Sequence, residues 1–218
     1  MAITLYGRGP SSCTRRAALI LVEKGVPFEL VDLNTAAAEH KSLEFLTKQP
    51  FGQIPVLDDD GFLLYESRAI GRYIAEKYAN HGPALIPTNL KAKALFEQAA
   101  SVEVANFDNL ASRAVKEVIG KKRQGLAPDQ DRYNAIYADL SAKLDAYEAI
   151  RGLNGTIWAI LSKQKYLAGD EITLADLFHL PIGSMLITIT CDVFSKRPHV
   201  SSSRPSWQSI KESAKSTA

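Results

Sequence analysis

Cysteine is scarce in this chain of 218 residues, which carries only Cys13 and Cys191. The two residues form no CxxC pair, and the sequence has no cysteine and histidine cluster with metal-ligand spacing. A disulfide-stapled scaffold and a structural zinc module are therefore excluded. We predict a protein of a reducing, cytoplasmic compartment, with no metal site and no permanently bound cofactor.

Net charge and long apolar runs are also lacking. The formal net charge of +2 is too small to indicate a binder of nucleic acid or of a membrane surface. No apolar run approaches the roughly 20 residues that span a bilayer, and the first six residues resemble a strand more than a signal peptide. Because 46% of the residues are hydrophobic, a chain of this length can bury a core without staples. We expect a soluble protein that binds neither nucleic acid nor membrane.

The first 79 residues alternate between short strands and helices. Asp58-Asp59-Asp60-Gly61 is typical of a turn between two strands. The order strand–helix–strand, short helix, strand–strand–helix predicts an α/β domain over residues 1–79. The expected strands are 3–6, 28–33, 54–57 and 62–65, and the expected helices are 13–24, 42–48 and 66–78.

Residues 80–89 carry two prolines and a glycine without periodicity, and we interpret them as a linker. From residue 90 to residue 218 the pattern predicts an all-helical domain. Thr173 and Asp176 have the spacing of a capping box, with Ile172 and Leu177 at the positions of a hydrophobic staple. The expected helices are 92–119, 129–150 and one that opens at residue 173.

Gln53-Ile54-Pro55-Val56 places a proline at the head of a strand. Proline cannot donate to a sheet ladder, so this position is either an ordinary edge or a special backbone conformation. A cis Ile54–Pro55 bond would let the Ile54 backbone pair with an extended, peptide-like ligand, and we predict that the bond is cis.

Glu66 and Ser67 follow a predicted strand and open a helix. Free N–H groups and the positive end of the helix dipole favour an anionic ligand group there, and Glu66 could pair with an ammonium. The alternative is a simple N-cap.

Taken together, these motifs resemble a known family. Phe51-Gly52-Gln53-Ile54-Pro55 followed by Glu66-Ser67-Arg68-Ala69-Ile70 resembles the signature of cytosolic glutathione transferases. The similarity to the phi class of plants and fungi rests on further segments and covers nearly the whole chain. These are His40-Lys41, Phe107-Asp108 with Ala111-Ser112, Lys165 to Asp170, Thr173 to Leu177, and Leu180-Pro181 with Arg197 to Val200.

The resemblance implies a thioredoxin-like domain followed by an all-helical domain, in a homodimer that uses glutathione as co-substrate. It implies that His40, Lys41 and Gln53 bind the glycyl end of glutathione. Ile54, which precedes Pro55, would pair its backbone with the cysteinyl unit. The γ-glutamyl end would be bound by Glu66 and Ser67, with support from Arg68.

The catalytic residue must favour the thiolate, because the thiolate is the nucleophile and a free cysteine thiol has a pKa of about 8.5. A hydroxyl that donates to the sulfur does this. In phi-like sequences the serine four residues after the first-strand glycine has this role. Counting from Gly7 gives Ser11, with Ser12 as the runner-up. The alternative for Ser11 is a helix cap.

Cys13 opens a different chemistry, because related families with a cysteine at the active position exchange thiols and disulfides. The alternative is an inert, buried thiol, which we also expect for Cys191.

The chain departs from the family pattern in three places. Gly120 to Gly125 is polar where the family has apolar residues, which indicates either a less apolar acceptor pocket or a solvated helix end. An insertion is expected within residues 148–164, and a shortening at 200–204.

The main hypothesis is a glutathione transferase that adds the glutathione thiolate to apolar electrophiles, with reduction of organic hydroperoxides as a further activity. The alternatives are a non-catalytic carrier of glutathione and apolar ligands, and a thiol oxidoreductase that depends on Cys13. The expected acceptor pocket comprises Pro10, Ser12, Phe107, Ala111, Val115 and Ile119.

Overall fold

The computed structural model describes residues 3–148, 165–189 and 191–194. The chain divides into two compact units, Met1–Ile86 and Pro87–Ala218. The insertion expected within 148–164 and the shortening at 200–204 lie almost wholly outside the described residues.

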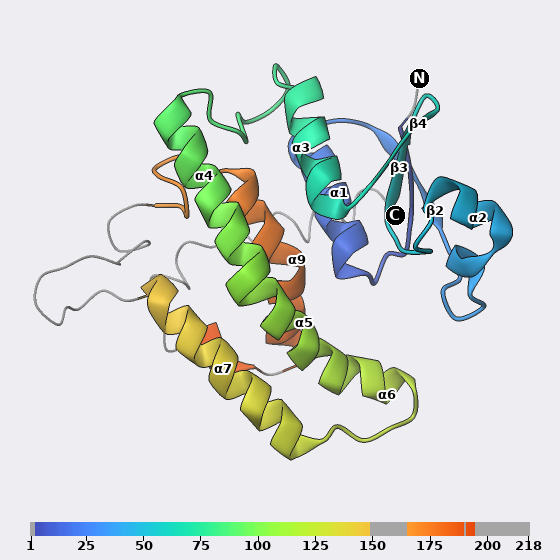
Figure 1. The fold of residues 1–218 in the computed structure, drawn as a ribbon, viewed down its shortest axis with the longest axis vertical. Coiled ribbons are helices and arrows are strands. Elements are labelled where there is room, and N and C mark those ends of the chain that lie inside the picture. The colour runs from blue at the N-terminus through green and yellow to red at the C-terminus, as the bar shows by residue number, and fades with distance from the viewer. Residues whose placement is uncertain (1–2, 149–164, 190, 195–218) are drawn as a thin grey trace, which may run out of the picture. The chain divides into compact units, whose positions relative to one another are not determined.

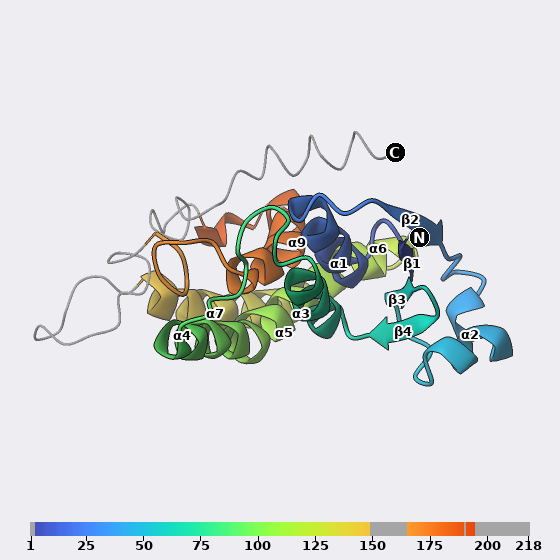
Figure 2. The same cartoon turned by 90° about the horizontal axis from the view of Figure 1, so that it is seen from above.

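The first unit is a four-stranded sheet with the strand order β2-β1-β3-β4. β1 pairs in parallel with β2, whereas β3 is antiparallel to both β1 and β4. Helices α1 and α3 lie on one side of this sheet and α2 on the other (Figures 1 and 2). The strands are β1 (Ile3–Gly7), β2 (Phe28–Asp32), β3 (Val56–Asp59) and β4 (Phe62–Tyr65), and the helices are α1 (Ser12–Glu23), η1 (Glu39–Lys41), α2 (Leu43–Lys48) and α3 (Ser67–Lys77).

Alternation along β1 explains how the sheet packs. Ile3, Leu5 and Gly7 are buried, whereas Thr4 and Tyr6, which alternate with them, are only half-buried. In α1 and α3 the apolar residues recur at helical spacing, so each helix has one apolar face, and that face is buried. The core of the first unit includes Ile3, Leu5, Ala17, Ile20, Leu21, Val56, Leu57, Ile70 and Ile74.

The predicted turn between β3 and β4 is confirmed. Its two loop residues, Asp60 and Gly61, have φ of 57° and 88°, as a two-residue hairpin with a type I′ turn requires. Asp58 Oδ1 accepts from the Gly61 N–H over 2.8 Å.

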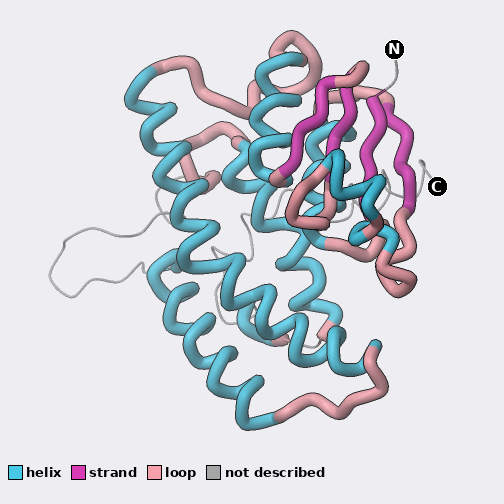
Figure 3. The backbone as a smooth tube through the Cα atoms, turned by 45° about the vertical axis from the view of Figure 1, so that its right-hand side comes forward, coloured by secondary structure: helices cyan, strands magenta, loops and turns pink. Residues whose placement is uncertain are grey.

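The second unit is helical within the described residues. The segment predicted as one helix over 92–119 is a helical run from Leu90 to Arg123 (Figure 3). It contains two π-helical stretches. Its parts are α4 (Leu90–Val102), the π segment η2 (Glu103–Asp108), α5 (Asn109–Val115), the π segment η3 (Lys116–Gly120) and α6 (Lys121–Arg123). It is followed by α7 (Gln130–Glu148), α9 (Leu174–Thr188) and the short 3-10 turn η4 (Asp192–Phe194).

An apolar core joins these helices. It includes Phe107, Ala111, Ala114 and Val115 from the long helical run, Ile136, Leu140, Leu144 and Tyr147 from α7, and Ile182, Leu186, Cys191, Val193 and Phe194. Cys191 is thus a core residue, as expected.

No described helix has the length and apolar character needed to cross a bilayer.

The capping box of α9 is confirmed. Asp176 Oδ2 accepts from the Thr173 N–H, and Asp176 Oδ1 accepts from the Leu167 N–H over 2.8 Å. Desolvation raises the pKa of this carboxyl above its usual range, although three hydrogen bonds oppose the shift.

The polar stretch Gly120 to Gly125 ends the long helical run. Lys122, Arg123 and Gln124 are exposed, and Gly125 has a φ of 73°, which is typical of a residue just after a helix. These features favour the solvated helix end over a lining of polar side chains.

Candidate functional site

A cavity of about 430 Å³ lies within the first unit. All eight residues that the resemblance assigned to glutathione binding line it. Three further lining residues were missed as ligand contacts, namely Thr35, Gln49 and Gly52, and Cys13 lines it as well. The full lining is Cys13, Thr35, His40, Lys41, Gln49, Gly52, Gln53, Ile54, Pro55, Glu66, Ser67 and Arg68.

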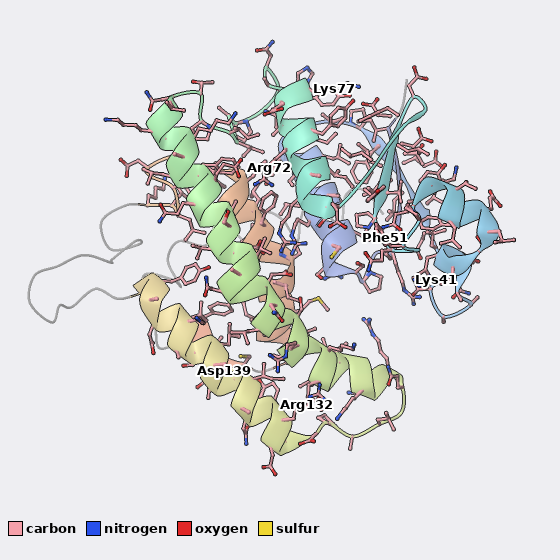
Figure 4. All side chains as sticks on the ribbon, in the orientation of Figure 1. Lys41, Phe51, Arg72, Lys77, Arg132 and Asp139 are labelled. Carbon is pink, nitrogen blue, oxygen red and sulfur yellow. The ribbon has the colours of Figure 1, made fainter. Side chains whose placement is uncertain are left out.

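Gly52 brings two segments of the lining together. Its φ of 58° suits glycine, and a Cβ there would lie 2.7 Å from Lys41 Cδ and 2.8 Å from the His40 carbonyl oxygen. Because no side chain is present, Lys41 Nζ can donate to the Phe51 carbonyl over 2.9 Å (Figure 4). The His40-Lys41 segment therefore depends on a glycine twelve residues later in the chain.

On this side of the cavity, the Gln49 side chain and the Nδ1 atom of the half-buried His40 are buried. His40 Nδ1 is buried and has no hydrogen-bond partner among the described residues. Gln49 is 1% exposed, and its Oε1 accepts from the Gln53 N–H over 3.1 Å. Leaving a buried nitrogen unpaired costs free energy.

The Ile54–Pro55 peptide bond is cis, which confirms the prediction. The two residues immediately precede β3, which pairs with β1 and β4 from Val56 onward. Proline therefore stands outside the ladder, where its missing N–H is harmless.

Glu66 has φ 69° and ψ 104°, a strained backbone for a residue with a side chain. It is the residue before α3, yet its side chain makes no capping hydrogen bond. Glu66 therefore occupies the N-cap position of α3, but its side chain does not cap the helix. Ser67 follows as the first residue of α3 and is 5% exposed.

The charges around the cavity have both signs. Glu66 is the carboxylate of the lining, and His40, Lys41 and Arg68 are its basic side chains. The positive end of the α3 dipole adds to the basic side. Such a lining suits a small zwitterion with more carboxylates than ammonium groups.

Ser11 is the N-cap of α1. Its Oγ accepts from the Thr14 N–H over 3.3 Å, and its own N–H donates to the Arg8 carbonyl. The loop before it is held by two more bonds, since Thr14 Oγ1 accepts from the Arg8 N–H and Asp32 Oδ1 accepts from the Gly9 N–H. Neither Ser11 nor Ser12 is among the residues that line the cavity, whereas Cys13 is.

The chain matches two family models. The model described as the N-terminal domain of glutathione S-transferase matches residues 1–76, and the model described as its C-terminal domain matches residues 111–202. The chain belongs to the glutathione S-transferase family. The predicted fold, a thioredoxin-like domain followed by a helical domain, is confirmed by these matches.

Known glutathione S-transferases resemble the chain over nearly its whole length. One from Arabidopsis thaliana, PM239X14, is 43% identical over 204 residues, which are 92% of this chain and 88% of the relative. The crystal structure of transferase F7 from Populus trichocarpa superposes with a TM-score of 0.87, at 38% identity over 97% of this chain and 99% of its own. Transferase I of maize, solved with an atrazine glutathione conjugate, has a TM-score of 0.85 at 34% identity over 100% of both chains. The phi-class resemblance is confirmed.

The residues expected to form the acceptor pocket of this glutathione S-transferase belong to two units. Pro10 and Ser12 lie in the first. Phe107, Ala111 and Val115 are buried in the core of the second unit, and Ile119 packs against that core. Phe107 also contacts the ring of His179, with centroids 4.7 Å apart.

The described residues contain no group of histidine, cysteine, aspartate and glutamate that could hold a metal ion.

Proposed function

We propose that this glutathione S-transferase conjugates glutathione, held in the cavity of the first unit, to apolar electrophiles, and that the Ser11 hydroxyl stabilises the thiolate. One observation carries the proposal. Two separate segments, His40 to Pro55 and Glu66 to Arg68, present complementary polar groups to a single cavity.

The glycyl carboxylate of glutathione binds to Lys41, His40 and Gln53. Lys41 supplies a charge-assisted hydrogen bond, which is stronger than a neutral one. His40 lines the cavity and adds an imidazole that can hydrogen-bond the same carboxylate. The cysteinyl unit pairs with the Ile54 backbone and brings its sulfur toward the start of α1.

The γ-glutamyl end binds at α3. Its ammonium pairs with Glu66, and its carboxylate accepts from Ser67 and from the free N–H groups of the helix N-terminus. Arg68 adds positive charge. The strained backbone of Glu66 is consistent with a position kept for binding rather than for folding.

Ser11 acts on the sulfur. Its capping bond occupies one lone pair of Oγ and leaves the hydroxyl hydrogen free to donate to the thiolate. The thiol proton passes to solvent, the sulfur forms a bond to the electrophilic carbon, and a leaving group such as chloride departs with its bonding electrons. The maize relative solved with an atrazine conjugate makes chlorinated aromatic heterocycles one substrate class to test.

A hydroperoxide is a further substrate class. Its distal oxygen is transferred to one glutathione as a sulfenic acid, releasing the alcohol, and a second glutathione then gives glutathione disulfide and water.

The test is conjugation of a chlorinated dinitrobenzene by the wild type and by Ser11→Ala, Ser12→Ala and Cys13→Ser. The expected kcat/KM falls about 100-fold in Ser11→Ala and stays near the wild-type value in the other two. Unchanged activity in Ser11→Ala would overturn the serine assignment. Glutathione binding without any conjugation by the wild type would favour the carrier.

A second candidate function is thiol–disulfide exchange by Cys13, and it is favoured by one observation, namely that Cys13 lines the cavity. The Cys13 thiolate would attack a disulfide and release one thiolate. One glutathione would then displace the reduced substrate thiolate and remain bonded to Cys13, and a second glutathione would release glutathione disulfide and regenerate the Cys13 thiolate. Glutathione-dependent disulfide reduction that is lost in Cys13→Ser and retained in Ser11→Ala would support this function.

The protein works in the cytoplasm as a homodimer. Phe51 is 65% exposed although its ring lies 6.3 Å, centroid to centroid, from that of Tyr65, and Leu90 is 81% exposed. Large exposed apolar side chains are typical of interaction sites. Sedimentation should show a dimer for the wild type and a larger monomer fraction for Phe51→Ser, and a monomeric wild type would contradict the dimer.

A further inference from the structure

Arg16 is a buried cation to which the proposed glutathione site assigns no role. It lies on α1 and is 0% exposed. Its Nη1 donates to Ser67 Oγ over 2.9 Å, across 51 residues of sequence, and lies 3.7 Å from Cys13 Sγ. Burying a guanidinium is costly unless strong hydrogen bonds compensate it. A buried arginine bonded to a residue of the cavity lining therefore calls for a reason beyond packing.

The chemistry of the Ser67 hydroxyl supplies that reason. A hydroxyl has one hydrogen to donate and two lone pairs, whereas a guanidinium can only donate. Arg16 therefore fills a lone pair of Ser67 and leaves its hydrogen for another acceptor. Ser67 lines the cavity and donates to none of the residues that the structure describes. Its hydroxyl is thus prepared to donate to an acceptor in the cavity.

We propose that Arg16 is a positioning residue that fixes Ser67 as a hydrogen-bond donor to the γ-glutamyl carboxylate of glutathione. The guanidinium also polarises the Ser67 hydroxyl and so strengthens its bond to an anion. Without Arg16 the hydroxyl could rotate and present a lone pair to the carboxylate. The inference rests on the proposed glutathione site and adds to it a residue outside the cavity lining.

Lys24 offers a matched control in the same unit. It directly follows α1, is 1% exposed, and its Nζ donates to the Pro83 carbonyl over 2.8 Å. Desolvation lowers its pKa. Lys24 is thus a second buried cation at α1, but its partner belongs to the segment after α3 and not to the cavity lining. Replacing it removes a buried charge without touching Ser67.

The test compares glutathione with two amide analogues on the full chain by calorimetric titration. One analogue has a carboxamide in place of the γ-glutamyl carboxylate, and the other has one in place of the glycyl carboxylate. The wild type should discriminate against both analogues. Arg16→Gln should bind glutathione roughly tenfold more weakly and lose most of the γ-glutamyl discrimination while it keeps the glycyl one. Lys24→Gln should lower the melting temperature and keep both discriminations.

The proposal is overturned if Arg16→Gln keeps the wild-type discrimination against the γ-glutamyl amide. It is also overturned if the variant loses both discriminations equally and melts at a lower temperature. Should Arg16→Gln fail to fold, Arg16→Lys and Ser67→Ala carry the test. Ser67→Ala should lose the γ-glutamyl discrimination, and adding Arg16→Lys to it should change the discrimination no further. A further loss in the double variant would overturn the proposal. A wild type that binds no glutathione would instead overturn the proposed function, which separates the two failures.

Discussion

In the first unit, two buried polar side chains line the cavity and a third donates to one of them, whereas in the second unit two buried carboxylates hold helix ends. Gln49 and Ser67 line the cavity, and Arg16 donates to Ser67. In the second unit, Glu117 accepts from the Asp129 N–H just before α7, and Asp176 accepts from the backbone at the start of α9. Burial of a polar group alone therefore does not identify a site, because the same cost can be offset by a helix backbone. The hydrogen-bonding partner of the buried group distinguishes the two cases.

The two carboxylates of the second unit also differ from each other. Burial raises the pKa of Asp176. The pKa of Glu117 is held below its usual range, first by the hydrogen bond from Lys121 and then by the Asp129 N–H. Arg132, on α7, is a further cation near Glu117 (Figure 4).

The largest effect should come from removing a helix-end carboxylate of the second unit. Asp176→Ala leaves the backbone N–H groups of Thr173 and Leu167 without their acceptor, and we expect a loss of about 3 kcal/mol in the free energy of unfolding. Denaturant titration measures this. Thr188→Ala, which removes an exposed bond at the other end of α9, should cost less than about 0.5 kcal/mol. Equal losses in the two variants would contradict the assigned role of Asp176.

A smaller effect, on binding rather than folding, should follow from Gly52→Ala. The new Cβ would displace Lys41 and the His40 backbone, so we expect a roughly tenfold higher Kd for glutathione. Gly61→Ala is the matched control, because Gly61 also has a positive φ but has nothing within 4 Å of the added Cβ. It should strain the hairpin and leave the Kd unchanged. A Kd raised equally by both substitutions would show that strain, not displacement, weakens binding.

The smallest effect concerns the pH dependence of stability. The lowered pKa of Glu117 means that its stabilisation is present above the ordinary glutamate value of about 4.5 and is lost as the pH falls through the folded-state pKa. Glu117→Gln should therefore melt a few degrees below the wild type at pH 7, roughly 2–4 °C, and the gap should narrow in acid. Melting curves from pH 7 to pH 3 check this, with the exposed Glu44→Gln as a charge control. A constant gap would rule out the linkage.

Local patterns predicted much of this structure. The hairpin turn and the capping box of Thr173 and Asp176 each rest on residues close in sequence. The lining residues of 53–55 and 66–68 were expected from the family resemblance of two short motifs. The start of β3 was placed too early, at residue 54 instead of Val56. Pro55 has no N–H for the ladder, so pairing begins after it.

Other features depend on contacts that no short window contains. Glu117 and Asp129 are separated by a helix end and a loop, and neither has a motif around it. Arg15 and Arg16 are neighbours with the same side chain, yet Arg15 is exposed and Arg16 is wholly buried. Only the packing of α1 against α3 distinguishes them. Thr35 and Gln49 were likewise not predicted to line the cavity, because no motif in the sequence surrounds them.

The two π-helical stretches in the run from Leu90 to Arg123 affect how this protein is compared with its relatives. A π turn closes on the fifth residue instead of the fourth, so each stretch shifts the angular phase of every side chain after it. A face counted at 3.6 residues per turn from Leu90 will be misassigned beyond Asp108. Helical wheels, scanning substitutions and aligned pocket residues should therefore restart their count at Asn109 and again at Lys121.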